Sequence, residues 1–265
     1  MDYADYQKYS GREVQEDENM NYLRKGKGIS LSMNKVIIGV DRDGTLIVDP
    51  GYYGSQANWR DSFRIVPYAI EGLSLLSGFF PNSYIIVFSN QSGPAQEIVK
   101  EETVYEINNL LKRTFYKDNI HIELFMNSFK ISKAMAIARG IPENNPYVDR
   151  DSPGNNPQYL DPNYCRTRKP NDGLYYDALN LLGMNEKDIK HTIMIGDKHT
   201  DIEFGLNIGA LSCFVKTNSE NEEAKAKYLS KTIMLQKESP ARVFIAEHMK
   251  EAAEWIIEQF IKRYG

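Results

Sequence analysis

The chain has 265 residues, of which 42% are apolar and 26% are charged. This composition is typical of a globular protein and excludes collagen-like or wholly disordered chains. The formal net charge is −4, so no global positive field favours nucleic acid or an anionic membrane as the partner. No apolar run is long enough to cross a bilayer. The two cysteines cannot form a disulfide framework, and the N-terminus does not resemble a secretory signal. The sequence therefore predicts a cytoplasmic protein.

Short apolar runs alternate with helical patterns along most of the chain. The runs typical of buried strands cover residues 36–40, 84–88, 122–126, 191–195 and 211–215. The helical patterns cover residues 69–76, 97–116, 173–182 and 200–209. This alternation predicts an α/β fold with a doubly wound, Rossmann-like parallel sheet. Such a sheet binds ligands beyond the carboxyl ends of its strands, where the strand order reverses.

Three segments complete the predicted organisation. Residues 1–34 are polar and have little apolar surface to bury, so we interpret them as an N-terminal arm, either loosely ordered or docked through its tyrosines. Residues 35–265 form the domain, in which the proline-rich segment 142–170 is predicted to be a long irregular loop. Apolar residues at mostly four-residue steps predict a C-terminal helix over about 241–263, for core packing or a dimer interface.

Acidic residues follow two of the predicted strands. Asp41 and Asp43 come directly after residues 36–40, and Asp197 and Asp201 come after residues 191–195. Turn preference explains an Asp-Gly pair, but not a further acid emerging from a buried run. Carboxylates that point at one position repel each other unless a proton or a cation lies between them. Their oxygen donors favour Mg²⁺ as that cation.

Groups that can bind phosphate oxygens occur at two further places. Ser89 and Asn90 follow the run 84–88, where a hydroxyl, an amide and backbone N–H groups can donate hydrogen bonds. Arg168 and Lys169 close the proline-rich loop with two positive charges. Because the strand ends of a parallel sheet share one edge, we expect these groups to converge with the acids.

The four motifs resemble those of the haloacid dehalogenase-like superfamily of phosphotransferases. They are DRDGTL at residues 41–46, SN at 89–90, RKP at 168–170 and GDKHTD at 196–201. The resemblance covers about residues 35–236. It is similar to the branch that contains histidinol-phosphate phosphatase and D-glycero-D-manno-heptose-1,7-bisphosphate 7-phosphatase. It implies a Mg²⁺-dependent phosphomonoester hydrolase, and the spacing of the motifs predicts a minimal or absent cap domain.

The resemblance implies a role for each motif residue. Asp41 would be the nucleophile that forms an aspartyl-phosphate, and Asp43 would be the general acid and base. Ser89 and Lys169 would hold the phosphoryl oxygens. The positions that would contact the rest of the substrate are Asn90, Arg168 and Lys198. The Mg²⁺ ligands would be Asp41, the carbonyl of Asp43, and Asp197. Asp201 would orient these groups without binding the ion directly.

One feature of that branch is missing from this sequence. A zinc-binding loop of Cys and His commonly precedes the RKP motif. Here Cys165 stands four residues before Lys169, but Thr167 occupies the position of the second cysteine. One thiolate cannot complete a tetrahedral site, so we predict no structural zinc.

The expected substrate is a small phosphorylated metabolite, foremost a sugar phosphate such as D-glycero-D-manno-heptose 1,7-bisphosphate. Histidinol phosphate and a polynucleotide 3′-phosphate are the alternatives, and the acidic composition counts against nucleic acid. A catalytically silent binding protein on the same fold is the non-enzymatic alternative. The sequence does not separate hydrolase from phosphotransferase or mutase activity, and it leaves the oligomeric state open.

Overall fold

The computed structural model describes residues 35–149, 164–216 and 222–264. The predicted N-terminal arm and the middle of the proline-rich loop lie outside the described residues. Within those ranges the strands form one parallel sheet in the order β3-β2-β1-β4-β5-β6. The strands are β1 (Lys35–Val40), β2 (Ser83–Asn90), β3 (Ile122–Ser128), β4 (Ile189–Gly196), β5 (Leu211–Val215) and β6 (Val243–Ala246). This arrangement confirms the doubly wound, Rossmann-like α/β fold.

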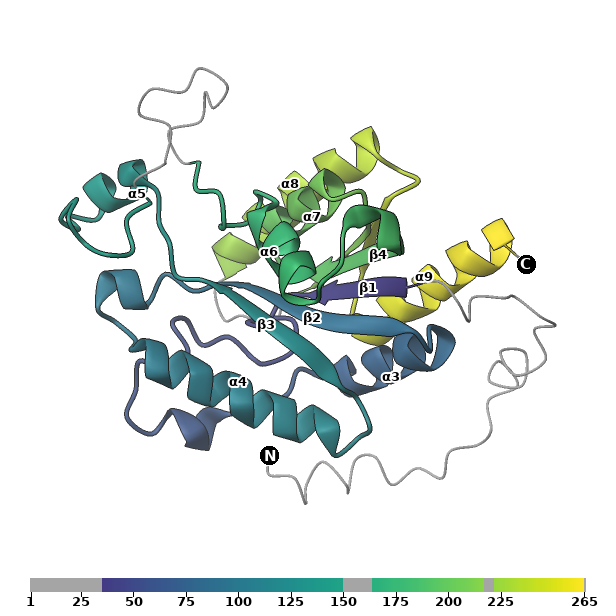
Figure 1. Ribbon diagram of the computed structural model, residues 1–265, viewed down its shortest axis with the longest axis horizontal. Helices are drawn as coiled ribbons and strands as arrows, with labels where there is room; N and C mark the ends of the chain where they lie inside the picture. The colour runs from purple at the N-terminus through teal and green to yellow at the C-terminus, as the bar shows by residue number, and fades with distance from the viewer. Residues whose placement is uncertain (1–34, 150–163, 217–221, 265) are drawn as a thin grey trace.

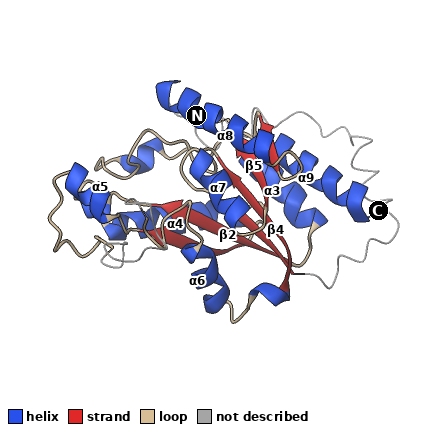
Figure 2. Ribbon diagram, turned by 90° about the horizontal axis from the view of Figure 1, so that it is seen from above, coloured by secondary structure: helices blue, strands red, loops and turns tan. Residues whose placement is uncertain are grey.

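Helices cover both faces of the sheet (Figure 1). The first face carries α3 (Ala69–Phe79), α4 (Glu101–Tyr116) and α9 (Met249–Tyr264). The second face carries α6 (Gly173–Leu181), α7 (His199–Asn207) and α8 (Glu222–Glu238). The short helix α5 (Lys133–Ala138) lies to one side of the sheet, as both Figure 1 and Figure 2 show. Short 3₁₀ helices occupy Trp59–Ser62, Pro94–Gln96 and Glu186–Asp188.

Strand β1 shows why the buried runs have no polar face. Its side chains alternate across the sheet: Val36 and Ile38 pack in the cluster under α3, α4 and α9, and Ile37 packs in the cluster under α6 and α7. Both faces are covered, so each strand is apolar throughout. Between β3 and α6, the described residues 129–149 and 164–172 hold only α5 and loops. None of the helices in the described ranges has the length and apolar character needed to cross a membrane.

Two boundaries differ from the sequence predictions. The C-terminal helix begins at Met249, not near residue 241, because Val243–Ala246 pairs with β5 as an edge strand. Phe244 of this strand stacks on Trp255 of α9, with ring centroids 4.9 Å apart. The apolar residues at four-residue steps therefore belong partly to a strand and partly to a helix, so the pattern placed the start of the helix too early. Helix α4 begins at Glu101 rather than at Glu97, whose φ of 57° is left-handed. Helix α8 and strand β6 were not predicted from the sequence.

Candidate active site

The sheet reverses its strand order between β1 and β4. From β1 the next strands in the chain, β2 and β3, lie on one side, and β4, β5 and β6 lie on the other. Asp41 follows β1 and Asp197 follows β4, and the Asp41 N–H donates a hydrogen bond of 2.9 Å to the Ile195 carbonyl. The two acids are 3% and 1% exposed. They therefore occupy the position at which folds of this class bind ligands.

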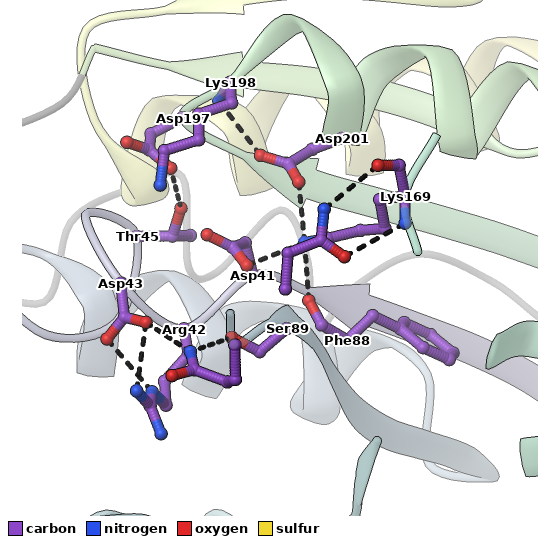
Figure 3. Close-up of polar contacts among 12 residues, drawn as sticks. Asp41, Arg42, Asp43, Thr45, Phe88, Ser89, Lys169, Asp197, Lys198 and Asp201 are labelled. Atoms are coloured by element: carbon purple, nitrogen blue, oxygen red, sulfur yellow. Dashed lines mark hydrogen bonds and ion pairs between the residues drawn. The ribbon is translucent and has the colours of Figure 1, made fainter. Parts of the chain in front are cut away.

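Lys169 lies at the centre of the site (Figure 3). Its Nζ is 2.7 Å from Asp41 Oδ1 and 2.6 Å from Asp201 Oδ1, and it donates to the Phe88 carbonyl at 2.6 Å. Burial alone would lower the pKa of Lys169, but Asp201 and Asp41 outweigh it and raise the pKa above its ordinary value. The ammonium is therefore a fixed positive charge beside Asp41.

Asn90 fixes the backbone of Lys169. Its Oδ1 accepts from the Lys169 N–H at 3.0 Å, and its Nδ2 donates to the Lys169 carbonyl at 3.0 Å. Both polar groups of the side chain are thus occupied by the main chain of one residue, 79 positions away. This pairing joins the end of β2 to the end of the proline-rich loop.

Three buried carboxylates form a candidate metal site. Asp41, Asp197 and Asp201 each place one oxygen within 4.8 Å of the others. Burial raises the pKa of Asp41, and the charge of Asp201 raises it further against the opposing effect of Lys169. Such a cluster of oxygen donors suits a hard divalent cation such as Mg²⁺.

The three carboxylates do not have the same surroundings. Asp201 uses Oδ1 for Lys169, and its Oδ2 accepts from the Lys198 backbone N–H at 2.9 Å. Asp197 Oδ1 accepts from the Thr45 hydroxyl at 3.4 Å. Gly196 permits this arrangement, because a Cβ there would lie 2.4 Å from the Asp201 side chain. Asp201 is therefore held in place by the chain itself.

Asp43 lies next to this cluster and is held by an arginine. Arg42 donates from Nε to Asp43 Oδ1 and from Nη2 to Oδ2, both at 3.0 Å. Gln91 Nε2 donates to Asp43 Oδ2 at 2.6 Å and to Ser89 Oγ at 2.7 Å. Burial would raise the pKa of Asp43, but the Arg42 guanidinium overcomes this effect and lowers it. Asp43 is consequently ionised at neutral pH in the free protein.

Carboxylates outnumber cations by two at this site. The carboxylates are Asp41, Asp43, Asp49, Asp197 and Asp201, and the cations are Arg42, Lys169 and Lys198. A single divalent cation would balance this difference. Lys198 Nζ lies 3.9 Å from Asp49 Oδ2. Burial would lower the Lys198 pKa, but Asp197, Asp41 and other acids raise it well above its ordinary value.

The structure brings most of the predicted residues together and adds others. Asp41, Asp43, Ser89, Lys169 and Asp197 converge on one edge of the sheet (Figure 3). Lys198 lies beside them, and Arg168 is half-buried with its Nη1 unpaired among the described residues. Three further residues orient Asp43 and its neighbours and were not predicted from the sequence: Arg42, Gln91 and Asn108. A charged residue between two motif aspartates was the available signal for Arg42.

The loop before Lys169 is held in part by an aspartate. The Asp149 carboxylate accepts from the Arg166 N–H at 3.2 Å. Burial, together with a hydrogen bond to Asp149, raises the pKa of Cys165 to about 12. The two segments on either side of the undescribed part of the loop are thus linked through Asp149.

Comparisons with known proteins find a family model and relatives that resemble this chain. A family model described as HAD-hydrolase-like matches residues 166–252. The histidine biosynthesis bifunctional protein HisB of Baumannia cicadellinicola subsp. Homalodisca coagulata is 28% identical over 198 residues, covering 75% of this chain and 46% of the relative. The D-glycero-D-manno-heptose-1,7-bisphosphate 7-phosphatase of Thermosynechococcus vestitus is 23% identical over 233 residues, covering 87% and 100%.

A solved structure shows the same fold. The D,D-heptose 1.7-bisphosphate phosphatase from B. bronchiseptica, complexed with magnesium and phosphate, superimposes with a TM-score of 0.57 at 18% identity. The alignment covers 85% of this chain and 99% of that one. The family model and the curated relatives thus make this chain similar to haloacid dehalogenase-like hydrolases. The chain spans less than half the length of the first curated relatives that it matches.

Proposed function

We propose that the protein is a Mg²⁺-dependent phosphomonoester hydrolase that acts through an aspartyl-phosphate on Asp41. The observation that carries this proposal is the buried Asp41 carboxylate at the reversal of strand order, 2.7 Å from Lys169 and grouped with Asp197. Lys169 offsets the charge of Asp41, so a phosphate dianion can approach it. Phosphoryl transfer depends mostly on positioning and charge neutralisation, which this arrangement supplies.

In the first step, a carboxylate oxygen of Asp41 attacks the phosphorus and the bond to the leaving oxygen breaks. Asp43 supplies the proton that the leaving oxygen takes. In the second step, Asp43 accepts a proton from water as the water attacks the aspartyl-phosphate, which releases inorganic phosphate and restores Asp41. Because Arg42 lowers the pKa of Asp43 in the free protein, the negative charge of the bound phosphate must raise that pKa before the first step.

Magnesium bound at this site would supply charge stabilisation to the phosphoryl oxygens. We assign it to Asp41, Asp197 and the backbone carbonyl of Asp43, because both side-chain oxygens of Asp43 already pair with Arg42. Asp201 orients Lys169 rather than binding the ion, because both of its oxygens are occupied. The two-charge excess of carboxylate at the site supports a divalent rather than a monovalent cation.

The remaining predicted residues are assigned to the phosphoryl group, to the rest of the substrate, or to positioning Lys169. Ser89 and Lys169 are proposed to hold phosphoryl oxygens, and Arg168 and Lys198 are proposed to contact the rest of the substrate. Besides its predicted contact with substrate, we propose that Asn90 positions Lys169, because its side-chain amide is hydrogen bonded to both the N–H and the carbonyl of Lys169.

The proposed substrate is a small phosphorylated metabolite, foremost a sugar phosphate such as D-glycero-D-manno-heptose 1,7-bisphosphate. The heptose-bisphosphate phosphatases among the curated relatives support this choice. Histidinol phosphate is the second candidate, favoured by the relatives named for histidine biosynthesis. We propose the reducing cytoplasm as the location, since both cysteines are free thiols.

Hydrolysis of p-nitrophenyl phosphate, with Mg²⁺ and with a chelator, tests the chemistry. Asp41→Asn should abolish turnover, and Asp61→Asn, which removes a carboxylate on the exposed 3₁₀ helix, should leave it unchanged. Rapid quenching with radiolabelled substrate should trap acid-stable label on the wild-type chain only. Turnover that persists in Asp41→Asn would refute the nucleophile, and no turnover of any phosphorylated metabolite would favour a silent binding protein.

A panel of phosphorylated metabolites then tests the substrate. The panel should include heptose bisphosphate, histidinol phosphate and a polynucleotide 3′-phosphate, ranked by kcat/KM, because this ratio reports transition-state binding. We expect the sugar phosphate to rank first. A higher kcat/KM for either of the other two substrates would replace it.

A further inference from the structure

A cavity lies at the opposite edge of the sheet from Asp197. Its volume is about 520 Å³, within the range of sites for small metabolites. Its walls come from the first residues of β4 and β5, from the turn after α7 and from the last turns of α9. His191 lines it, and Asp197 follows the same strand six residues later. At about 3.3 Å per residue the two places are roughly 20 Å apart.

The cavity carries an excess of positive charge. Its cationic lining residues are Lys190, Arg242, Lys262 and Arg263. Glu186 is the one carboxylate among the lining residues, and Lys262 is already paired with Glu258 at 2.6 Å. Within the described ranges, Lys190 and Arg263 have no carboxylate within 4.0 Å. Among the described residues, these two lining cations therefore have no ion-pair partner.

Aromatic rings form part of the wall beside these cations. The His191 imidazole lies edge-to-face on Phe260, with centroids 4.7 Å apart, and 5.2 Å from the Tyr264 ring. Burial lowers the pKa of His191, and the charges of Lys190 and Arg263 lower it further. His191 is thus mainly neutral at pH 7, and it forms part of the cavity lining.

We propose that this cavity binds a small phosphorylated organic molecule, with its phosphate on Lys190 and Arg263 and its organic part against His191 and Tyr264. A guanidinium binds two phosphate oxygens at once, and an ammonium adds a second charge-assisted bond. The phosphate would neutralise the two unpaired cations, and the rings would bury apolar surface of the ligand. This site uses none of the residues of the candidate active site.

Proton NMR of the histidine rings can test this binding without any turnover. The chain has four histidines, His121, His191, His199 and His248, and the His191→Gln variant assigns the His191 signal. In a chelator, adenosine 5′-monophosphate should shift the His191 signal with a saturable dependence on concentration. His199 lies two residues after Asp197 and reports binding at the other site. Inorganic phosphate and adenosine, titrated separately, show whether both halves of the ligand contribute.

Matched charge variants separate a specific site from general attraction. Lys190→Gln/Arg263→Gln should weaken binding by roughly tenfold or more. Lys187→Gln/Lys250→Gln removes the same charge from α9 and the neighbouring 3₁₀ helix, outside the cavity lining, and should leave the affinity within about twofold. Equal weakening in both variants overturns the proposal. So does a titration in which His199 moves and His191 does not, or in which neither signal moves up to about 10 mM ligand.

Discussion

Arg42 is the residue whose removal tests the electrostatics of the site most directly. Its side chain is fully buried, at 0% exposure, and it donates three hydrogen bonds. Two go to Asp43 at 3.0 Å, and one goes from Nη1 to Asn108 Oδ1 at 2.9 Å. Arg42→Met keeps much of the aliphatic volume but leaves both acceptors without this donor.

The expected cost follows from breaking a buried ion pair. Removing one partner of such a pair costs about 3–5 kcal/mol, because the other charge stays buried without compensation. Against a typical total stability of about 5–15 kcal/mol, this is roughly a fifth or more of the free energy of unfolding. Arg60 makes the matched exposed pair, with Glu106 at 2.7 Å and side chains 59% and 52% exposed. Arg60→Met should cost no more than about 1 kcal/mol.

The sign of the pH dependence gives a second readout. Arg42 lowers the pKa of Asp43 below its ordinary value of 3.8. The stabilisation from this pair is therefore fully present above pH 4 and is lost as the pH falls through the lower folded-state pKa. The difference in unfolding free energy between wild type and Arg42→Met should shrink as the pH falls below 4.

Urea denaturation at pH 7, with the midpoint and slope fitted together, measures the cost. A double-mutant cycle with Asp43→Asn apportions it, and the double variant should lose roughly 1–3 kcal/mol less than the sum of the single variants. If Arg42→Met costs no more than the Arg60→Met control, or if the cycle shows no coupling, the buried pair does not act as described. The circular dichroism spectrum confirms that each variant folds.

Three further predictions concern the same chain. Gly196→Ala would place a Cβ 2.4 Å from the Asp201 side chain. The substitution should therefore lower the free energy of unfolding in urea by about 1–3 kcal/mol, and it should also lower turnover. Unchanged stability would show that the Asp201 side chain moves aside freely. Mg²⁺ at about 100 times its Kd should stabilise the protein by roughly 2.7 kcal/mol, which can be measured as a rise in Tm. The Asp197→Asn substitution should remove most of this stabilisation. An equal rise in Tm for the variant would mean that the ion binds elsewhere. Burial and Asp149 raise the pKa of Cys165 to about 12, and burial raises the pKa of Cys213. Neither thiol should therefore react with iodoacetamide at pH 8 unless urea is added. Rapid labelling of the folded protein would contradict this prediction.

The sequence by itself determined strands β1 to β5 of the sheet and the acidic residues that follow β1 and β4. Strands such as β1 are buried on both faces, so their composition identifies them without knowledge of their neighbours. Asp41 and Asp197 could be predicted as candidate site residues, because they directly follow such strands. Segments without this uniform burial were harder to predict. Thr232 is the one fully buried residue of α8, and β6 is a four-residue edge strand whose apolar pattern runs on into α9.

Tertiary structure alone decided how the side chains pair. Asn90 meets the Lys169 backbone across 79 positions, and Lys169 meets Asp41 across 128. Arg42 is adjacent to Asp43 in the chain, but its choice of Asn108 as the third partner depends on the packing of α4 against the sheet. These contacts depend on the orientation of side chains brought together by the crossovers between strands. A linear pattern carries the residue types but not those orientations, because many chain paths satisfy the same alternation of apolar and polar residues.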